Sequence, residues 1–371
     1  MKDQIIKTVI KDIIKDSISQ TGNSAIVLRK VGDIVVEQRP IPIIEDSHCV
    51  KIAIKATGIC GSDIHYYRNG GIGKYILKAP MVLGHESSGQ VVEIGNAVTR
   101  VKVGDRVAIE PGVPNRYSDE TKEGRYNLCP HMAFAATPPI DGTLVKYYLS
   151  PEDFLVKLPD GVSYEEGACV EPLSVGVHAN KLAGVHFGNR VVVLGAGLVG
   201  LLTGAVARAF GASDVVFVDV FDNRLDRAKD FGATHTFNAS KLSAQELADE
   251  VKELLGGQNA DIVFECSGAD ACIDAGLKVT KAGGTMVQIG MGKNYTSFSI
   301  AEVSGKEMKL IGCFRYSFGD YRDAVKLVAS GKVNVKAMIT HRFKFEDAGK
   351  AYDFNIAHVG EVVKTIITGP A

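Results

Sequence analysis

The sequence lacks an excess of charge of either sign. Its 42 Lys and Arg residues are balanced by 43 Asp and Glu residues, which leaves a formal net charge of -1. A nucleic-acid-binding surface, or one that binds an acidic membrane, would show a basic excess. Apolar runs approaching the ~20 residues of a membrane-spanning helix are also missing. We therefore expect neither nucleic acid nor a membrane among the partners.

Cysteines are few, odd in number and without the spacing of a disulfide framework. Free thiols fit a reducing compartment, so we expect a cytoplasmic protein. Five of the seven lie in or beside apolar runs and are interpreted as small buried residues: Cys49, Cys169, Cys266, Cys272 and Cys313.

The N-terminal segment lacks a secretory leader. Isoleucine and valine recur at helical spacing between Ile5 and Ile14. A mitochondrial presequence would be rich in Arg and poor in acidic residues. This segment has no Arg and contains Asp3, Asp12 and Asp16. We expect residues 1–24 to be an extension outside the fold.

The length of 371 residues exceeds what one hydrophobic core usually supports, so two domains are expected. The first half shows short strands separated by glycine-containing turns, which predicts a mostly β, barrel-like domain over residues 25–171. The predicted strands are 25–28, 34–37, 50–56, 89–95 and 105–109.

After residue 171 the pattern changes to continuous apolar strands that alternate with helices. This alternation predicts a doubly wound parallel sheet over residues 172–312. The predicted elements are strands 189–194, 214–219, 261–266 and 284–290 and helices 198–210 and 223–231. The tail, 313–371, contains a predicted helix (321–329) and strand (362–367), and we expect it to return to the first domain.

A dinucleotide-binding turn follows the first strand of the second half. Gly195, Gly197 and Gly200 form a GxGxxG between a strand and a helix, where backbone N–H groups can reach a pyrophosphate. Asp219 ends the next strand, where a carboxylate accepts hydrogen bonds from ribose hydroxyls and repels a 2′-phosphate. This predicts NAD rather than NADP. Arg224 can face a phosphate, but we expect it to flank the adenosine.

Four residues far apart in the sequence offer zinc ligands. Cys60, His85, Glu86 and Glu171 provide a thiolate, an imidazole and two carboxylates. A catalytic zinc keeps one position open, so either Glu86 or Glu171 can complete the protein side. We expect one catalytic zinc at which an alcohol is oxidised.

Proton transfer is assigned to the loop that follows Cys60. Ser62 can take the hydroxyl proton and His65 can pass it to solvent. The alternatives are a turn-forming serine and an ordinary surface histidine. Asp63 either holds a ligand imidazole or simply forms a turn.

Five motifs together resemble the zinc-dependent medium-chain dehydrogenases, and within them the polyol (sorbitol and xylitol) dehydrogenases. The motifs are GICGSDIHYY (58–67), MVLGHESSG (81–89), GRYNLCP (124–130), EPLSVGVH (171–178) and GAGLVG (195–200). The resemblance implies a GroES-like catalytic domain, split in sequence around a Rossmann domain. It also implies oxidation of a polyol at C2 to a 2-ketose with NAD.

The resemblance also assigns residues. It gives zinc to Cys60, His85 and Glu86, with Glu171 either a ligand or a partner of the zinc-bound water. The substrate positions that it implies are Tyr66, Phe134, Glu171, Arg315 and Tyr316. The cofactor positions that it adds are Val199, Asp219, Arg224, Ile289, Gly290, Met291, Cys313, Phe314 and Arg315.

One departure from the family concerns a second, structural zinc, which many relatives hold with four cysteines. The matching positions here are Asn115, Ser118, Thr121 and Cys129. A single thiolate cannot hold a tetrahedral zinc, so we expect no structural zinc. Family precedent implies a homotetramer, with a homodimer possible.

Three alternatives stay open. The first is another zinc alcohol dehydrogenase, acting on threonine or a simple secondary alcohol. The second is a dinucleotide-binding sensor without catalysis, against which the intact ligand set argues. The third is a zinc-free, NADPH-dependent quinone reductase, which the ligand set and Asp219 disfavour.

Overall fold

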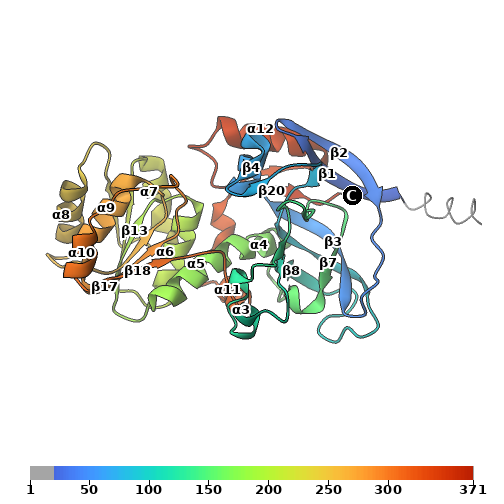
Figure 1. Cartoon of the computed structure of the whole chain (residues 1–371), viewed down its shortest axis with the longest axis horizontal. Helices are drawn as coiled ribbons and strands as arrows, with labels where there is room; N and C mark the ends of the chain where they lie inside the picture. Colours follow the sequence, from blue (N-terminus) through green and yellow to red (C-terminus); the bar gives the residue numbers. More distant parts are fainter. Residues whose placement is uncertain (1–20, 371) are drawn as a thin grey trace, which may run out of the picture.

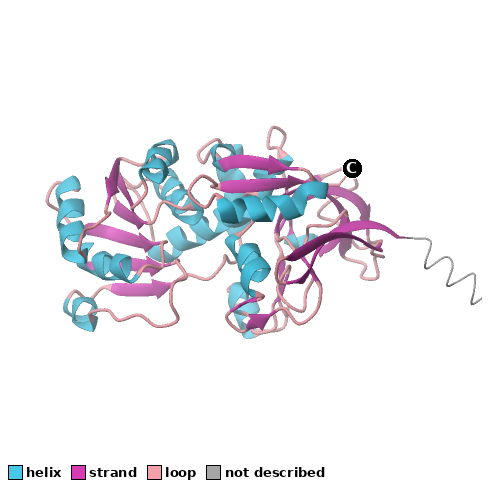
Figure 2. Cartoon of the chain, turned by 90° about the horizontal axis from the view of Figure 1, so that it is seen from above, coloured by secondary structure: helices cyan, strands magenta, loops and turns pink. Residues whose placement is uncertain are grey.

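The computed structural model describes residues 21–370. Figure 1 shows two lobes with α4, α5 (Val170–Ala183) and α11 (Asp320–Ala329) at their junction. One lobe is built around antiparallel strands, and the other is a parallel sheet between helices (Figure 2). Within the described residues, no helix is long and apolar enough to span a membrane.

The first lobe contains a seven-stranded sheet in the order β12-β8-β7-β3-β20-β19, with β11 also paired to β3. The central strand β3 pairs antiparallel with β7 on one side and with β20 on the other. Its strands are β3 (Cys49–Gly58), β7 (Glu86–Ile94), β8 (Arg106–Ile109), β11 (Tyr147–Pro151), β12 (Leu155–Lys157), β19 (Ile339–Phe343) and β20 (Lys364–Thr368).

Smaller sheets complete this lobe. β1 pairs with β2 and β6, β9 with β10, and β4 with β5. Their bounds are β1 (Thr21–Lys30), β2 (Asp33–Pro40), β4 (Gly71–Ile72), β5 (Tyr75–Ile76), β6 (Met81–Val82), β9 (Gly112–Val113) and β10 (Ala133–Phe134).

The second lobe is a six-stranded parallel sheet in the order β15-β14-β13-β16-β17-β18. Helices cover both faces, so the central strands are continuous buried apolar runs. The strands are β13 (Arg190–Leu194), β14 (Asp214–Asp219), β15 (His235–Asn238), β16 (Ala260–Glu265), β17 (Thr280–Gln288) and β18 (Lys309–Gly312).

The helices join these sheets. Besides α5 and α11, they are α2 (Gly61–Asn69), α3 (Asp119–Lys122), α4 (Tyr164–Ala168), α6 (Leu198–Ala209), α7 (Asp222–Ala228), α8 (Ala244–Leu254), α9 (Asp270–Val279), α10 (Ile300–Gly305) and α12 (Ala348–Ala357). Short 3-10 helices lie at Tyr126–Leu128, Glu152–Phe154, Lys229–Phe231, Val335–Met338 and Phe345–Asp347.

The predicted strand 214–219 and helix 198–210 are confirmed as β14 and α6, and the tail helix 321–329 as α11. The predicted helix 223–231 is wrong at its end. α7 stops at Ala228, and a 3-10 turn leads to Gly232, whose φ of 84° ends the element.

The start of the fold is also corrected. Strand β1 begins at Thr21, inside the segment predicted as the extension 1–24. The buried side chain of Asn23 accepts from the Tyr147 N–H at 2.7 Å and donates to the Tyr147 carbonyl at 3.2 Å. These polar residues show no apolar alternation, so only the pairing identifies the strand. The rest of the predicted extension, residues 1–20, lies outside the described residues.

The chain crosses between the lobes at α5, which contacts elements of both, including α6 and β7. The sequence predicts no helix over residues 170–183 and places a boundary at residue 171. The tail strand β20 pairs with β3, Ile366 opposite Gly58, so the end of the chain lies in the first lobe. The domain limits themselves, 25–171, 172–312 and 313–371, stay a proposal.

Candidate functional site

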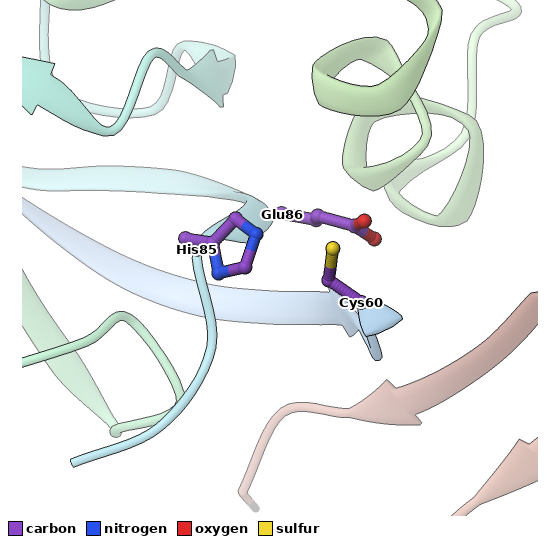
Figure 3. Close-up of side chains that lie close together, drawn as sticks. All are labelled: Cys60, His85 and Glu86. Atoms are coloured by element: carbon purple, nitrogen blue, oxygen red, sulfur yellow. The ribbon is translucent and has the colours of Figure 1, made fainter. Parts of the chain in front are cut away.

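Three predicted metal ligands come together through the register of one strand pair. Gly58, near the end of β3, lies opposite Glu86, the first residue of β7. Cys60 follows two residues later as the N-cap of α2, and His85 directly precedes β7. One donor atom from each of Cys60, His85 and Glu86 lies within 4.8 Å of the other two (Figure 3).

The Glu86 carboxylate supplies a test of whether a cation fits. Its Oε2 accepts from Lys364 Nζ at 2.5 Å, whereas its Oε1 is buried without a hydrogen-bond partner. An unpaired buried acceptor is costly unless something satisfies it. A zinc ion among sulfur, nitrogen and oxygen donors would do so, and this donor set suits zinc. These residues therefore fit the predicted metal.

Lys364 is a functional residue that the sequence prediction missed. It is fully buried on β20, and its ammonium also donates to the Ile59 carbonyl at 2.9 Å. A buried ion pair of this kind tolerates the loss of neither partner. The available signal was a lysine inside an apolar strand, because such a charge needs a partner there.

Gly58 leaves room for this pair. A Cβ at this position would lie 2.1 Å from Glu86 Oε2. Only glycine therefore lets β3 approach the carboxylate so closely.

Asp63 combines the two alternatives considered for it. It is fully buried, and its Oδ2 accepts from the Cys60 N–H at 3.1 Å, which caps α2. Its Oδ1 lies 3.6 Å from His85 Nδ1. Burial lowers the pKa of His85, but the charges of Asp63 and Cys60 outweigh burial and raise it. Asp63 therefore orients the imidazole from behind.

Glu171 lies beside the three donors but not within their group. It is in the first turn of α5 and is buried. Burial raises the pKa of its carboxyl to about 7, while nearby His85 lowers it and Glu86 raises it. Of the four predicted ligands, the structure gathers Cys60, His85 and Glu86, and it places Glu171 at their side.

The predicted proton-transfer residues Ser62 and His65 both lie on α2. Ser62 is half-buried next to Cys60. His65 is exposed, with Nδ1 3.5 Å from Asn69 Nδ2, and it lines a cleft that also contains Cys60. The structure thus puts His65 at the solvent side of the site.

That cleft has a volume of about 370 Å³ and lies between α2 of the first lobe and the glycine turn of the second. Its wall includes Cys60 and His65 on one side and Gly197 and Arg224 on the other. Gly197 is the N-cap of α6 and has no side-chain cap, so backbone N–H groups of the helix start face the cleft. The cleft therefore joins Cys60, one of the metal donors, to the predicted dinucleotide turn.

Each of the three positions in the turn requires or favours glycine for a different reason. Gly195 has a φ of 100°, which favours glycine. A Cβ on Gly197 would meet nothing within 4 Å, which leaves its surface free for a ligand. A Cβ on Gly200 would lie 1.8 Å from the Gly195 carbonyl oxygen, so this glycine lets helix and strand pack closely.

Asp219 is held at the end of β14 by backbone donors. Its Oδ2 accepts from the Ala196 N–H at 2.8 Å, and its Oδ1 accepts from the Val220 N–H at 2.8 Å. Arg224 Nη1 lies 3.6 Å from Asp219, and its guanidinium stacks over the Phe221 ring at 4.9 Å. The arginine thus faces the carboxylate rather than standing free for a phosphate.

The other predicted cofactor residues follow the carboxyl ends of the parallel strands, where ligands bind in such sheets. Val199 is in the first turn of α6. The Ile289 and Gly290 N–H groups both donate to the Glu265 carbonyl at 2.8 Å. Met291, Cys313 and Phe314 follow β17 and β18, with Met291 and Phe314 exposed.

The predicted substrate residues gather around the donors. Phe134 is buried, with its ring centre 5.6 Å from that of His85. The Arg315 guanidinium lies 3.6 Å from the centre of the Phe134 ring. Tyr316 is 1% exposed, and its hydroxyl has no hydrogen-bond partner in the described structure, although it lies close enough to Glu171 to lower the pKa of that carboxyl. Tyr66 is also buried, and Arg315 lowers its pKa against the larger effect of burial.

The positions that the family resemblance matches to a structural zinc site form a helix cap instead, because Ser118 is the N-cap of α3. Ser118 donates to Thr121 Oγ1 at 3.0 Å and accepts from the Thr121 N–H. Cys129 is buried, which raises the pKa of its thiol, but Ser118 and neighbouring backbone groups lower it more. Two of the three replacements for cysteine thus bond to each other.

Comparison with known proteins agrees with this geometry. Residues 46–160 match the family profile "Alcohol dehydrogenase GroES-like domain", and residues 199–330 match "Zinc-binding dehydrogenase". Sorbitol dehydrogenase 1 of Saccharomyces cerevisiae is 84% identical over 355 residues, covering 95% of this chain and 99% of that protein. D-xylulose reductase of the same yeast is 56% identical, covering 94% of this chain and 99% of that protein.

Among solved structures, L-idonate 5-dehydrogenase from Escherichia coli superimposes with a TM-score of 0.86 at 30% identity. The match covers 93% of this chain and 98% of that one. These similarities and the two profiles confirm the predicted pairing of a GroES-like domain with a Rossmann domain. The chain belongs to the zinc-dependent medium-chain dehydrogenase family.

Proposed function

We propose that this protein oxidises a polyol such as sorbitol or xylitol at C2 to the 2-ketose and transfers the hydride to NAD. Relatives named sorbitol dehydrogenase and D-xylulose reductase support this substrate class. The observation that carries it is the position of Cys60. It belongs to the metal donor group and also lines the cleft that holds Gly197.

Zinc would be held by Cys60, His85 and Glu86, with Glu171 close to His85 and Glu86. A bound zinc would act as a Lewis acid that lowers the pKa of the substrate hydroxyl. Ser62 would accept the hydroxyl proton and His65, exposed at the cleft, would pass it to solvent.

The pocket supports a substrate rich in hydroxyl groups. Arg315 offers guanidinium donors, and Tyr316 and Tyr66 offer hydroxyls, all close to the donor group. Phe134 provides an apolar wall between His85 and Arg315. A simple alcohol would leave the buried Tyr316 hydroxyl unpaired, which disfavours such a substrate.

NAD would bind along the glycine turn. Its pyrophosphate would lie at the start of α6, near Gly195, Gly197, Val199 and Gly200, and its ribose at Asp219. Arg224 would flank the adenosine beside Phe221. The segments Ile289–Met291 and Cys313–Arg315 would contact the rest of the cofactor.

We also propose a cytoplasmic protein that forms a homotetramer, with a homodimer as the alternative. Strand β18 forms the open edge of the parallel sheet, and such an edge is ready to pair with another strand. Leu310 on this strand is exposed, and so are four apolar residues that follow its neighbour β17 in the chain: Met291, Tyr295, Phe298 and Ile300. The free state of all cysteines in the described chain fits a reducing compartment.

The test is a substrate panel on the zinc-loaded protein with NAD and NADP. We expect NAD reduction with sorbitol and xylitol, and much slower reduction with 2-butanol and threonine. Faster turnover of 2-butanol or threonine would point to another zinc alcohol dehydrogenase. No turnover of any alcohol at full zinc occupancy would overturn the proposal in favour of a non-catalytic dinucleotide-binding protein.

A further inference from the structure

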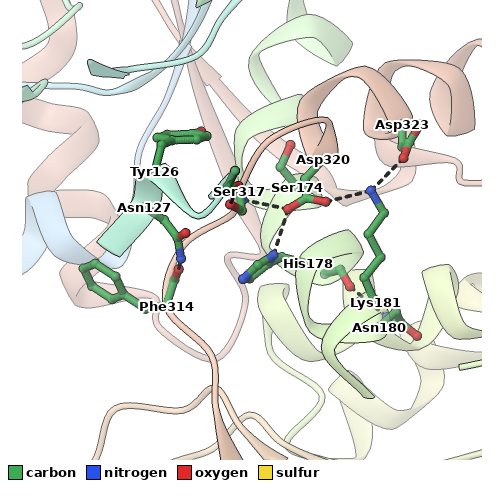
Figure 4. A network of polar contacts seen from close by, with 12 residues as sticks. Tyr126, Asn127, Ser174, His178, Asn180, Lys181, Phe314, Ser317, Asp320 and Asp323 are labelled. Carbon is green, nitrogen blue, oxygen red and sulfur yellow. Dashed lines mark hydrogen bonds and ion pairs between the residues drawn. The ribbon is translucent and has the colours of Figure 1, made fainter. Parts of the chain in front are cut away.

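Asp320, the first residue of α11, is a buried carboxylate with three donors from different parts of the chain. It is 2% exposed. Its Oδ2 accepts from the Ser317 N–H at 2.6 Å and from His178 Nδ1 at 2.8 Å. Its Oδ1 accepts from Lys181 Nζ at 2.8 Å. Figure 4 shows these donors converging on the carboxylate from α5 and from the segment that leads into α11.

The segment from Phe314 to Phe318 carries Arg315 and Tyr316, and it is fixed at several further points. Asn127 Nδ2 donates to the Phe314 carbonyl at 2.8 Å, and Ser317 Oγ donates to the Gly124 carbonyl at 2.6 Å. Arg315 has a φ of 56°, a strained left-handed conformation for a residue with a side chain. Strain of this kind persists only where the surroundings impose it.

The other side of the Asp320 contacts is α5, which begins next to Glu171. His178 follows Glu171 by seven residues, about two helical turns, so both lie on one face of α5. The carboxylate of Asp320 thus ties the Arg315–Tyr316 segment to the helix face that presents Glu171. None of its contacts involves the metal donors or the glycine turn.

We propose that Asp320 is a positioning residue that fixes Arg315 and Tyr316 relative to Glu171 and so determines affinity for the polyol. The inference rests on the proposed function, because it assigns these residues to the substrate pocket. Asp320 itself does not touch the substrate. Its charge makes the bonds from His178 and Lys181 stronger than neutral ones, which holds the strained segment in place.

The test is Asp320→Asn, which keeps the size of the side chain and removes its charge. We expect the KM for sorbitol to rise by about tenfold, because charge-assisted hydrogen bonds are lost at a buried site. The kcat should change by less than about threefold. The zinc content should stay within about twofold of wild type, because Asp320 touches none of the metal donors. The Kd for NAD should rise less than the KM for sorbitol, because only the Cys313–Arg315 segment of the cofactor site depends on Asp320, and the glycine turn and Asp219 do not. Asp323→Asn is the matched control, since it weakens only the more exposed bonds from Lys181 and Lys326 and keeps the Asp320 carboxylate.

A double-mutant cycle with Arg315→Lys separates positioning from general stability. If Asp320 acts through Arg315, the change in ln KM in the double variant will be smaller than the sum of the changes in the two single variants. Strictly additive effects, or an equal loss of NAD affinity, would overturn the inference. If Asp320→Asn folds poorly, His178→Gln removes one donor only and should raise the KM in the same direction. An unchanged KM in both variants would overturn the inference and leave the proposed function intact, whereas a wild type inactive on sorbitol would overturn both.

Discussion

The cofactor cleft and the metal site are assembled in different ways. The glycine turn, α6 and Asp219 follow one another within one strand–helix–strand unit, and they act largely through backbone groups. The metal donors come from the ends of two paired strands, and the charge that supports Glu86 comes from Lys364 near the end of the chain. A site built from one local unit tolerates change elsewhere, whereas a site built from distant side chains depends on the whole sheet.

The largest difference between the two sites should appear with Cys60→Ser. Loss of the thiolate leaves too few ligands, so zinc should be lost and turnover should fall by at least about 10³-fold. The NAD Kd should change by less than about twofold, because the glycine turn lies on the other lobe. Metal analysis and NAD titration check this, with about one zinc per chain expected in the wild type. Full activity in the Cys60→Ser variant would contradict the assignment of Cys60 as a metal ligand. Two zincs per wild-type chain would contradict the expectation that the segment around Cys129 holds no structural zinc.

The next effect concerns the buried support of the metal site. Lys364→Met leaves the Glu86 carboxylate buried without its cation, which should destabilise the zinc-free protein by about 3–5 kcal/mol. Urea unfolding in the presence of a chelator measures this. Lys157→Met is the control, because its pair with Asp105 involves a lysine that is 53% exposed, and it should cost about 0–1 kcal/mol. Equal losses in the two variants would show that the Lys364 pair is not special.

A third prediction concerns Glu110, another buried carboxyl. Its hydrogen-bond partner is the neutral Tyr126 hydroxyl, whereas the partner of Glu86 is the Lys364 ammonium. Burial raises the pKa of Glu110 to about 7, although the hydrogen bond from Tyr126 lowers it. The folded protein therefore keeps a proton that the unfolded chain has already released between about pH 4.5 and pH 7. Because of Glu110, the free energy of unfolding should therefore fall as pH rises through this window, by up to about 3 kcal/mol in total. Above pH 7 the loss should level off.

Glu110→Gln should remove that dependence. Unfolding curves at pH 5 and pH 8 should show the variant gaining about 3 kcal/mol relative to wild type as pH rises. Glu93→Gln, at a carboxyl that is 53% exposed, should show no such gain. A parallel pH dependence of wild type and Glu110→Gln would contradict the prediction.

The smallest effect is expected on the cofactor side. Asp219→Ser removes the charge that repels a 2′-phosphate, together with the hydrogen bond from the Ala196 N–H of the glycine turn, so the preference for NAD over NADP should narrow by about tenfold. The ratio of kcat/KM for the two cofactors measures it. Asp214→Ser, at the other end of β14, should leave the ratio unchanged. An unaltered ratio in Asp219→Ser would remove its assigned role.

Much of the local structure could be predicted from the sequence, whereas contacts between residues far apart in the chain could not. The apolar strand 214–219 and the helix from Leu198 agree with the structure, because a buried parallel strand and a small-residue helix each have a period visible in sequence. The helix from Val170 to Ala183 was missed because it is buried on most sides, with the polar Glu171, Ser174 and Asn180 buried among the apolar residues, so its sequence shows no amphipathic stripe. The strand start at Thr21 was missed because its residues are polar.

Residue types within short stretches were enough to predict the family pattern, the parallel sheet with its glycine turn, and the candidate donors Cys60, His85 and Glu86. Three features became visible only in the fold: Glu171 lies beside the donor group, Lys364 pairs with Glu86, and Asp320 ties the Arg315 segment to α5. These depend on which buried charges meet across strands and helices far apart in the chain, and no local period records that.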